Sequence, residues 1–189
     1  MMNLLTYVVL PIYTVLLAAG YNWFTFNFSV IGYSLGRRDA FLFWGLLVGI
    51  CYGRTLSSIS GSLTRLHLLS ARGQTLFKVF IPLDLFILFC AVTTPYLPQV
   101  FPLKAILHIL FAAAAAILLL LFLTGLTWRL SRKDPKCSPS FYCCLAIAAV
   151  SVLLFLLAGI VSSSLEIFFT LSTIWLTDYF KKQLLNSAQ

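Results

Sequence analysis

Apolar stretches about as long as a bilayer is thick alternate along this chain with short polar connections. Six such stretches fit within its 189 residues. The chain is 61% hydrophobic and 10% charged, whereas a soluble domain is about half apolar and a quarter charged. A helix of about 20 apolar residues crosses the ~30 Å hydrocarbon core of a membrane. The sequence therefore predicts an all-α membrane protein, a polytopic bundle of six transmembrane helices.

The apolar stretches also set the expected boundaries within a single integral membrane domain, residues 1–189. The predicted transmembrane helices cover about 4–20, 40–53, 78–94, 103–128, 141–161 and 165–180. Between the second and third, segment 57–74 alternates leucines with Arg65, His67 and Arg72. That pattern is typical of an amphipathic helix lying along a membrane surface, so we expect an interfacial helix there.

Positive charge is distributed unevenly among the connections. Ten of the 13 Lys and Arg residues follow the second, fourth and sixth stretches: Arg54, Arg65, Arg72, Lys78, Arg129, Arg132, Lys133, Lys136, Lys181 and Lys182. Only Arg37, Arg38 and Lys104 lie on the other side. Because cytoplasmic loops retain Lys and Arg, both the N- and C-termini are expected in the cytoplasm.

The net charge of +8 raises the question of nucleic-acid binding. The basic residues sit just beyond the apolar stretches, where they meet anionic lipid headgroups. They form no basic face interleaved with stacking aromatic residues. We therefore expect membrane lipids as partners, no nucleic acid, and a multi-pass location in the membrane. The oligomeric state is left open.

Three ionisable residues fall inside the predicted helices: Asp84, His108 and Glu166. Ionisable groups are costly within a bilayer, so each is a candidate functional residue. His108 and Glu166 both lie close to the outer ends of their helices, whereas Asp84 is placed near the inner third of its helix. The outer loop, with its many aromatic residues, adds Trp23, Asn27 and Ser29 as candidate ligand-binding or reactive groups.

Several functions remain open for these residues. We expect His108 and Glu166 to face the interior of the bundle and to lie close together beneath the loop that carries Asn27 and Ser29. They could simply bridge two helices by a hydrogen bond. The same pair could activate the Ser29 hydroxyl in an intramembrane lipid hydrolase or transferase, with all three as catalytic residues. Asp84 could instead serve a small proton-coupled transporter, or join Asn27 and Trp23 in binding a ligand.

Metal and cofactor chemistry finds little support in the sequence. A catalytic zinc needs three convergent ligands. Only two histidines are present, and His67 is expected on the opposite side of the membrane from His108. Glycine-rich phosphate loops and nucleotide motifs are absent. We therefore expect neither a metal nor a cofactor.

Three short motifs carry a resemblance to a known family. They are Ser29-Val30-Ile31-Gly32 in the outer loop, Pro98 or Pro102 ahead of His108, and Glu166 with Trp175 further along the last helix. On these motifs and its layout, the chain resembles domain-of-unknown-function family 998 of bacterial membrane proteins. That family is similar in layout to the damage-regulated autophagy modulators and a GPI-anchor lipid-remodelling factor.

The resemblance has departures as well as matches. The family usually has an acid after the serine and an arginine after the glutamate, where this chain has Val30 and Ile167. The resemblance implies a six-helix fold in a bacterial plasma membrane. It also implies an outer-leaflet-facing cavity that binds lipid, and this is the leading expectation for the function.

Overall fold

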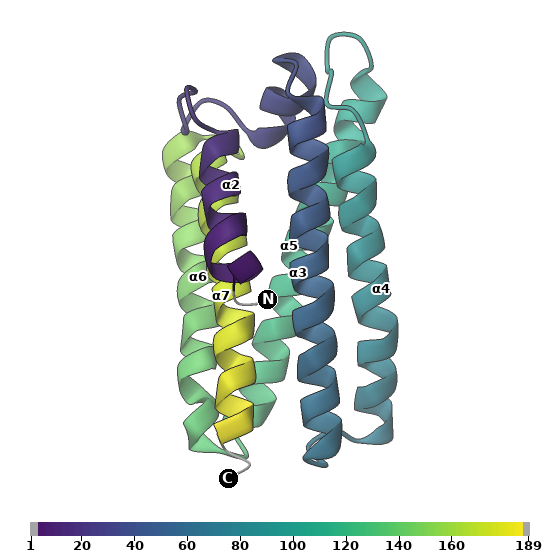
Figure 1. The fold of residues 1–189 in the computed structure, drawn as a ribbon, viewed down its shortest axis with the longest axis vertical. Helices are drawn as coiled ribbons and strands as arrows, with labels where there is room; N and C mark the ends of the chain where they lie inside the picture. Colours follow the sequence, from purple (N-terminus) through teal and green to yellow (C-terminus); the bar gives the residue numbers. More distant parts are fainter. Residues whose placement is uncertain (1–3, 187–189) are drawn as a thin grey trace.

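The computed structural model describes residues 4–186, which are helical over most of their length (Figure 1). The long helices are α3 (Arg38–Arg65), α4 (Ala71–Thr93), α5 (Pro102–Ser131), α6 (Ser138–Ala158) and α7 (Ser163–Asn186). The shorter elements are η1 (Leu5–Val9), α2 (Leu10–Leu17), η2 (Val30–Ser34) and η3 (Pro135–Cys137). The all-α class expected from the sequence is confirmed.

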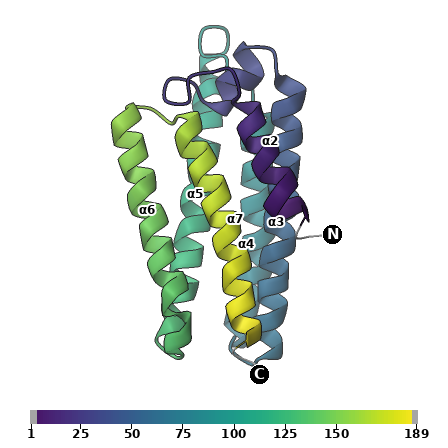
Figure 2. The same ribbon diagram turned by 60° about the vertical axis from the view of Figure 1, so that its left-hand side comes forward.

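The five long helices form a closed ring. Each of α3 to α6 packs against the next helix in the chain, and α7 packs back against α3. Successive helices run in opposite directions, and α2 lies outside the ring against α3 and α7 (Figures 1 and 2). Within the described residues, helices on opposite sides of the ring do not pack closely. The ring therefore leaves room for a cavity at its centre.

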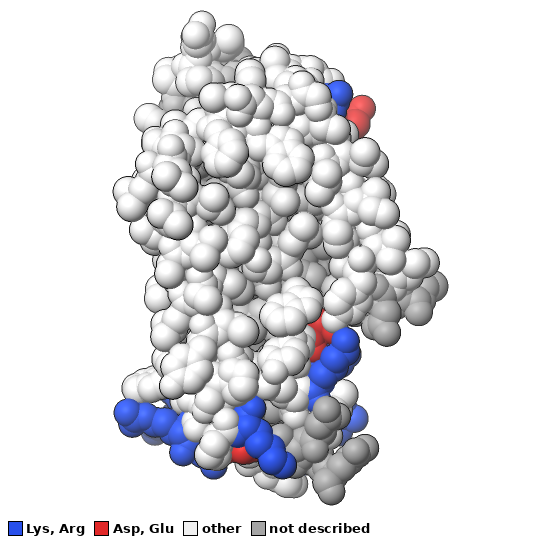
Figure 3. All heavy atoms as spheres, turned by 90° about the vertical axis from the view of Figure 1, so that its left-hand side faces the viewer, with Lys and Arg blue, Asp and Glu red and all other residues white. Residues whose placement is uncertain are grey.

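The two ends of the ring have different compositions. We call the end with the loop of residues 18–37 and the starts of α3, α5 and α7 the aromatic end. The opposite end is the basic end. On the face shown in Figure 3, most Lys and Arg atoms gather at the basic end, above which lies a broad uncharged region. This arrangement is typical of a protein whose middle faces hydrocarbon.

Four helices among the described residues are long and apolar enough to cross a membrane: α3, α4, α5 and the η3–α6 segment. By length and composition, the structure thus supports four of the six predicted transmembrane helices. The segment Leu5–Leu17 is a shorter apolar helix, about 20 Å long at ~1.5 Å per residue. Helix α7 is long enough to cross a membrane but is more polar than these four. Its polar residues include Thr170, Thr173 and Thr177, which are buried on its inward face.

The predicted interfacial helix over 57–74 is wrong. α3 continues without interruption to Arg65, the chain reverses over 66–70, and α4 already begins at Ala71. His67 adopts a left-handed conformation with φ of 53° in this reversal. Ser70 caps α4, since its hydroxyl accepts the Gly73 N–H at 3.3 Å.

The physical reason lies in where the apolar side chains of this segment pack. Ile59 and Leu63 are fully buried in a cluster at the basic end. Phe77 of α4, Leu130 of α5 and Phe180 of α7 complete that contact. These residues therefore face the neighbouring helices rather than the membrane surface, and we call their cluster the basic-end plug.

The α3–α4 contact is unusually close. A Cβ atom on Gly45 would lie 2.6 Å from Val92 Cγ1, closer than any carbon contact allows. Only glycine lets the two backbones approach to this distance, as at small-residue contacts between membrane helices generally. Nearby, Trp44 stacks on Phe41 and meets Phe28 edge-on. This side of the ring is therefore tightly packed.

Candidate functional site

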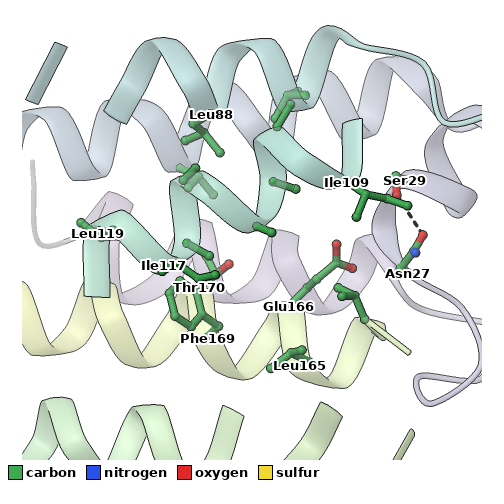
Figure 4. Close-up of a pocket in the computed structure, with 18 of the residues that line it drawn as sticks. Asn27, Ser29, Leu88, Ile109, Ile117, Leu119, Leu165, Glu166, Phe169 and Thr170 are labelled. Atoms are coloured by element: carbon green, nitrogen blue, oxygen red, sulfur yellow. Dashed lines mark hydrogen bonds between the residues drawn. The ribbon is translucent and has the colours of Figure 1, made fainter. Parts of the chain in front are cut away.

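The ring encloses a cavity of about 470 Å³ that reaches from the aromatic end to the middle of the helices. Helices α3 to α7 and the loop before η2 all contribute to its lining. Figure 4 shows part of it, with labelled residues from α4, α5, α7 and the loop. Most of the lining is apolar, including Trp44, Leu88 and Phe169. Its polar members include Asn27, Ser29, Tyr52, Asp84, His108, Ser151 and Glu166. The volume falls within the ~300–1,000 Å³ typical of ligand-binding pockets.

One edge of the cavity lies open on the side of the bundle. The lining residues with exposed side chains belong to α5 and α6 and to the turn that follows α6. Ile117 of α5 is 57% exposed and Val152 of α6 is 58% exposed, although both also line the cavity. The cavity therefore opens sideways between α5 and α6, toward the region that would face hydrocarbon.

At the aromatic end, the loop before η2 is fastened to α7. Glu166 in the first turn of α7 accepts the Phe28 N–H at 2.6 Å. Ser163 donates its own N–H to the Phe26 carbonyl at 2.7 Å. Asn27 Oδ1 accepts both the Ser29 hydroxyl at 2.9 Å and the Val30 N–H at 2.8 Å. These bonds hold the loop over the aromatic end of the cavity.

His108 is buried, and its side chain joins α5 to the end of α4. Its Nδ1 lies 2.7 Å from the carbonyl oxygen of Ala91 and 3.1 Å from that of Thr94. Because both partners are acceptors, Nδ1 carries a proton and donates it. These carbonyls belong to the end of α4, where helix carbonyls lack intrahelical partners. His108 therefore caps α4 from the neighbouring α5.

Asp84 and Ser151 are the two lining residues whose buried side-chain oxygens lack a hydrogen-bond partner among the described residues. Asp84 is 4% exposed, and its unpartnered atom is Oδ1. It lies 13 residues after the start of α4 and nine before its end. A helix beginning at residue 78, as expected from the sequence, would place Asp84 near its inner third. The earlier start at Ala71 moves Asp84 to the middle of α4, on the same cavity as His108 and Glu166.

The structure brings most of the predicted site residues together but does not pair them as expected. Asn27, Ser29, Asp84, His108 and Glu166 all line the cavity. No hydrogen bond joins His108 to Glu166 within residues 4–186. The Ser29 hydroxyl points to Asn27, as Figure 4 shows. A bonded His–Glu bridge and a Ser–His–Glu relay are therefore absent from this geometry.

Trp23 is not a lining residue. Its indole nitrogen donates to the Ala18 carbonyl at 3.2 Å, which holds the ring against the loop instead. The cavity also has lining residues on α3 that were not predicted from the sequence, namely Trp44, Val48 and Tyr52. Together with Phe41 they recur every three or four residues, so a helical stripe could have been recognised.

The described residues contain no group of three or more His, Cys, Asp or Glu placed to hold a metal ion. No family model, curated protein sequence or solved structure matches the chain. The interpretation of this site therefore depends on its own geometry.

Proposed function

We propose that this is a multi-pass membrane protein that binds the hydrocarbon chain of a lipid in its central cavity. One observation carries the proposal: an apolar cavity that opens sideways between two helices whose outer faces suit hydrocarbon. A ligand dissolved in the bilayer could pass through this opening without crossing water. The aromatic end, with its polar loop, would lie on the outer leaflet side.

We propose six membrane segments, with both termini in the cytoplasm. The ten-to-three charge difference supports this orientation, since the basic end would face the cytoplasm. A contact between the first and last helices supports it as well. Lys182 pairs with Asp178 at 3.0 Å and donates to the Tyr7 hydroxyl at 2.9 Å, and Tyr7 also donates to Asp178. The start of the first helix thus lies beside Asp178 and Lys182 of α7.

These partners also affect the titration of Lys182. The hydrogen bond to Tyr7 and the pairing with Asp178 raise the pKa of Lys182 to about 12. Lys182 is therefore charged at any physiological pH, as a residue marking the cytoplasmic boundary should be.

Transport through the bundle is less well supported than binding. A proton or solute path from Asp84 would have to reach both faces of the membrane. Toward the basic end, the way is filled by the basic-end plug, whose members Ile59, Leu63 and Phe180 are almost completely buried. A bundle that is closed at its basic end and open at its side favours binding over transport.

The proposal can be tested by blocking the side opening. The full-length protein would be purified in mild detergent, and co-purifying lipid would be counted by native mass spectrometry. Val152→Trp places a bulky side chain at the opening, so we expect a clear loss of bound lipid. Leu153→Trp is the matched control, because Leu153 is 54% exposed on the same helix but does not line the cavity. Equal lipid content in the two variants would contradict the proposal.

A further inference from the structure

Asp84 points to the chemistry of the cavity's ligand. Its carboxyl group is buried in the middle of α4, and it lines the cavity without a hydrogen-bond partner among residues 4–186. A buried carboxyl group without a partner is strongly disfavoured, so most native structures supply one. The cavity that Asp84 lines offers space for such a partner.

Several polar groups of the cavity lining present hydrogen-bond acceptors. Asp84 and Glu166 contribute two carboxyl groups, whereas none of the described residues of the lining is a Lys or Arg. Tyr52 bonds Thr173, whose hydroxyl donates to the carbonyl of Phe169. The Tyr52 proton is therefore used in that bond, and its oxygen is left as an acceptor on the cavity side.

His108 continues this pattern. Its Nδ1 proton is committed to the end of α4, which leaves Nε2 of the neutral ring as an acceptor. An anionic headgroup would find two carboxyl groups and no cation in this lining. A ligand that donates hydrogen bonds, and above all one that carries positive charge, would find its complement.

Asp84 and Glu166 differ in their need for such a ligand. Glu166 already accepts the Phe28 N–H at the aromatic end. Asp84 accepts nothing from the described part of the protein. An N⁺–H donor would both neutralise its carboxylate and form a charge-assisted hydrogen bond, which is about twice as strong as a neutral one.

We propose that the cavity selects a lipophilic amine, whose ammonium group bonds to Asp84 while its hydrocarbon part fills the apolar lining. This inference rests on the proposed function, because it names the class of ligand for the same cavity. The amine would pass between α5 and α6 from the bilayer. Its charged nitrogen would then stop at Asp84 in the middle of α4, since the basic-end plug closes the path beyond it.

The test uses the full-length protein in nanodiscs of neutral phosphatidylcholine, so that the lipid itself does not attract cations. Binding of dodecylamine, dodecanol and dodecanoate would be measured by equilibrium dialysis, with empty nanodiscs as the blank. We expect dodecylamine to bind about tenfold or more tightly than dodecanol, as an added ion pair predicts. Dodecanoate should bind most weakly.

Two substitutions locate the effect. Asp84→Asn should reduce the affinity for dodecylamine to that for dodecanol and leave dodecanol binding unchanged. Asp178→Asn is the matched control, because Asp178 pairs with Lys182 and lies outside the cavity lining, so it should keep the preference for the amine. The comparison of the three probes on the unmodified protein needs no variant, so it decides the matter even if Asp84→Asn fails to fold.

The possible outcomes separate the two proposals. If dodecylamine and dodecanol bind with equal affinity, or dodecanoate binds best, amine selection is overturned while lipid binding stands. If no probe binds the unmodified protein and Val152→Trp changes nothing, the proposed function fails as well. A preference for the amine that survives Asp84→Asn would also overturn the role given to Asp84.

Discussion

Helices α3 and α6 belong to the same ring but have opposite surroundings. α3 packs against α2, α4 and α7, and 50% of its most apolar stretch is buried. α6 contacts α5 and α7, and only 11% of its corresponding stretch is buried, although α6 is the more apolar of the two. In a soluble protein the more apolar helix would be the more buried one. In a membrane, the extra apolar residues face lipid, so burial and apolarity separate.

The difference assigns distinct roles to the two sides of the ring. The α3–α4 side is a tightly packed wall, in which even a methyl group is excluded at Gly45. The α5–α6 side borders the open edge of the cavity. A cavity that exchanges ligand with the bilayer, as proposed above, needs a packed wall and an open edge. The wall fixes the shape of the cavity, and the edge gives access to it.

The largest expected effect comes from truncating a leucine on each side. Leu56 on α3 is fully buried, whereas Leu156 on α6 is 69% exposed. Leu56→Ala should lower the free energy of unfolding by about 2 kcal/mol or more, because it leaves a void in packed surroundings. Leu156→Ala should change it by less than about 0.5 kcal/mol, as for surface positions. Unfolding in mixed micelles, followed by circular dichroism, would measure both.

A similar loss in the two variants would show that α3 and α6 are packed alike. The distinction between wall and edge would then have to be abandoned.

Adding a methyl group probes the same contrast at glycines. Gly45→Ala forces its Cβ into Val92 and should destabilise the protein by about 1–3 kcal/mol, the usual range for overpacking. Gly125→Ala on α5 meets nothing within 4 Å. It should be neutral or slightly stabilising, since alanine is the better helix former. Thermal unfolding in detergent gives the ranking, and Gly49→Ala, also with open space, is the control on α3 itself.

If Gly45→Ala and Gly49→Ala have the same stability, the close α3–α4 approach is not a constraint on the fold.

The smallest expected effect is an interaction energy. His108 ties α5 to the end of α4, while Glu166 ties α7 to the loop before η2. Because the two side chains have separate partners, their alanine substitutions should add to within about 0.5 kcal/mol in a double-mutant cycle. Glu166→Gln should keep most of the stability that Glu166→Ala loses, since its amide oxygen can still accept the Phe28 N–H. A larger coupling would restore the direct His–Glu pair expected from the sequence.

Local sequence patterns predicted the positions of helices α5 and α6 better than the tertiary contacts between helices. The apolar runs of α5 and α6 located those helices to within a few residues, because long apolar segments have few alternatives in a membrane. The end of α3 was missed because Ser57, Ser58 and Gly61 suggest a loop. The helix continues there because Ile59 and Leu63 pack into the basic-end plug, a tertiary contact that local sequence does not reveal.

The site shows the same division. The position of each residue along its helix was enough to place His108 and Glu166 near the same end of the bundle. Both residues do line the cavity. Their hydrogen-bond partners could not be inferred, because these are backbone groups of Ala91, Thr94 and Phe28 on other segments. Asp84 was misplaced in depth because its position depended on an uncertain helix start.

The closure of the ring has a consequence for how the protein is made. The contact between α3 and α7 joins the first long helix to the last, so one wall is supplied only after the rest of the chain has been synthesised. Until then, the interior formed by α3 to α6 is open on the α7 side. The hydrogen bond from Tyr7 also cannot form, because its partner Asp178 lies 171 residues later in the chain. A chain that ended before α7 would lack the lining residues Glu166 and Phe169, and with them one wall of the cavity.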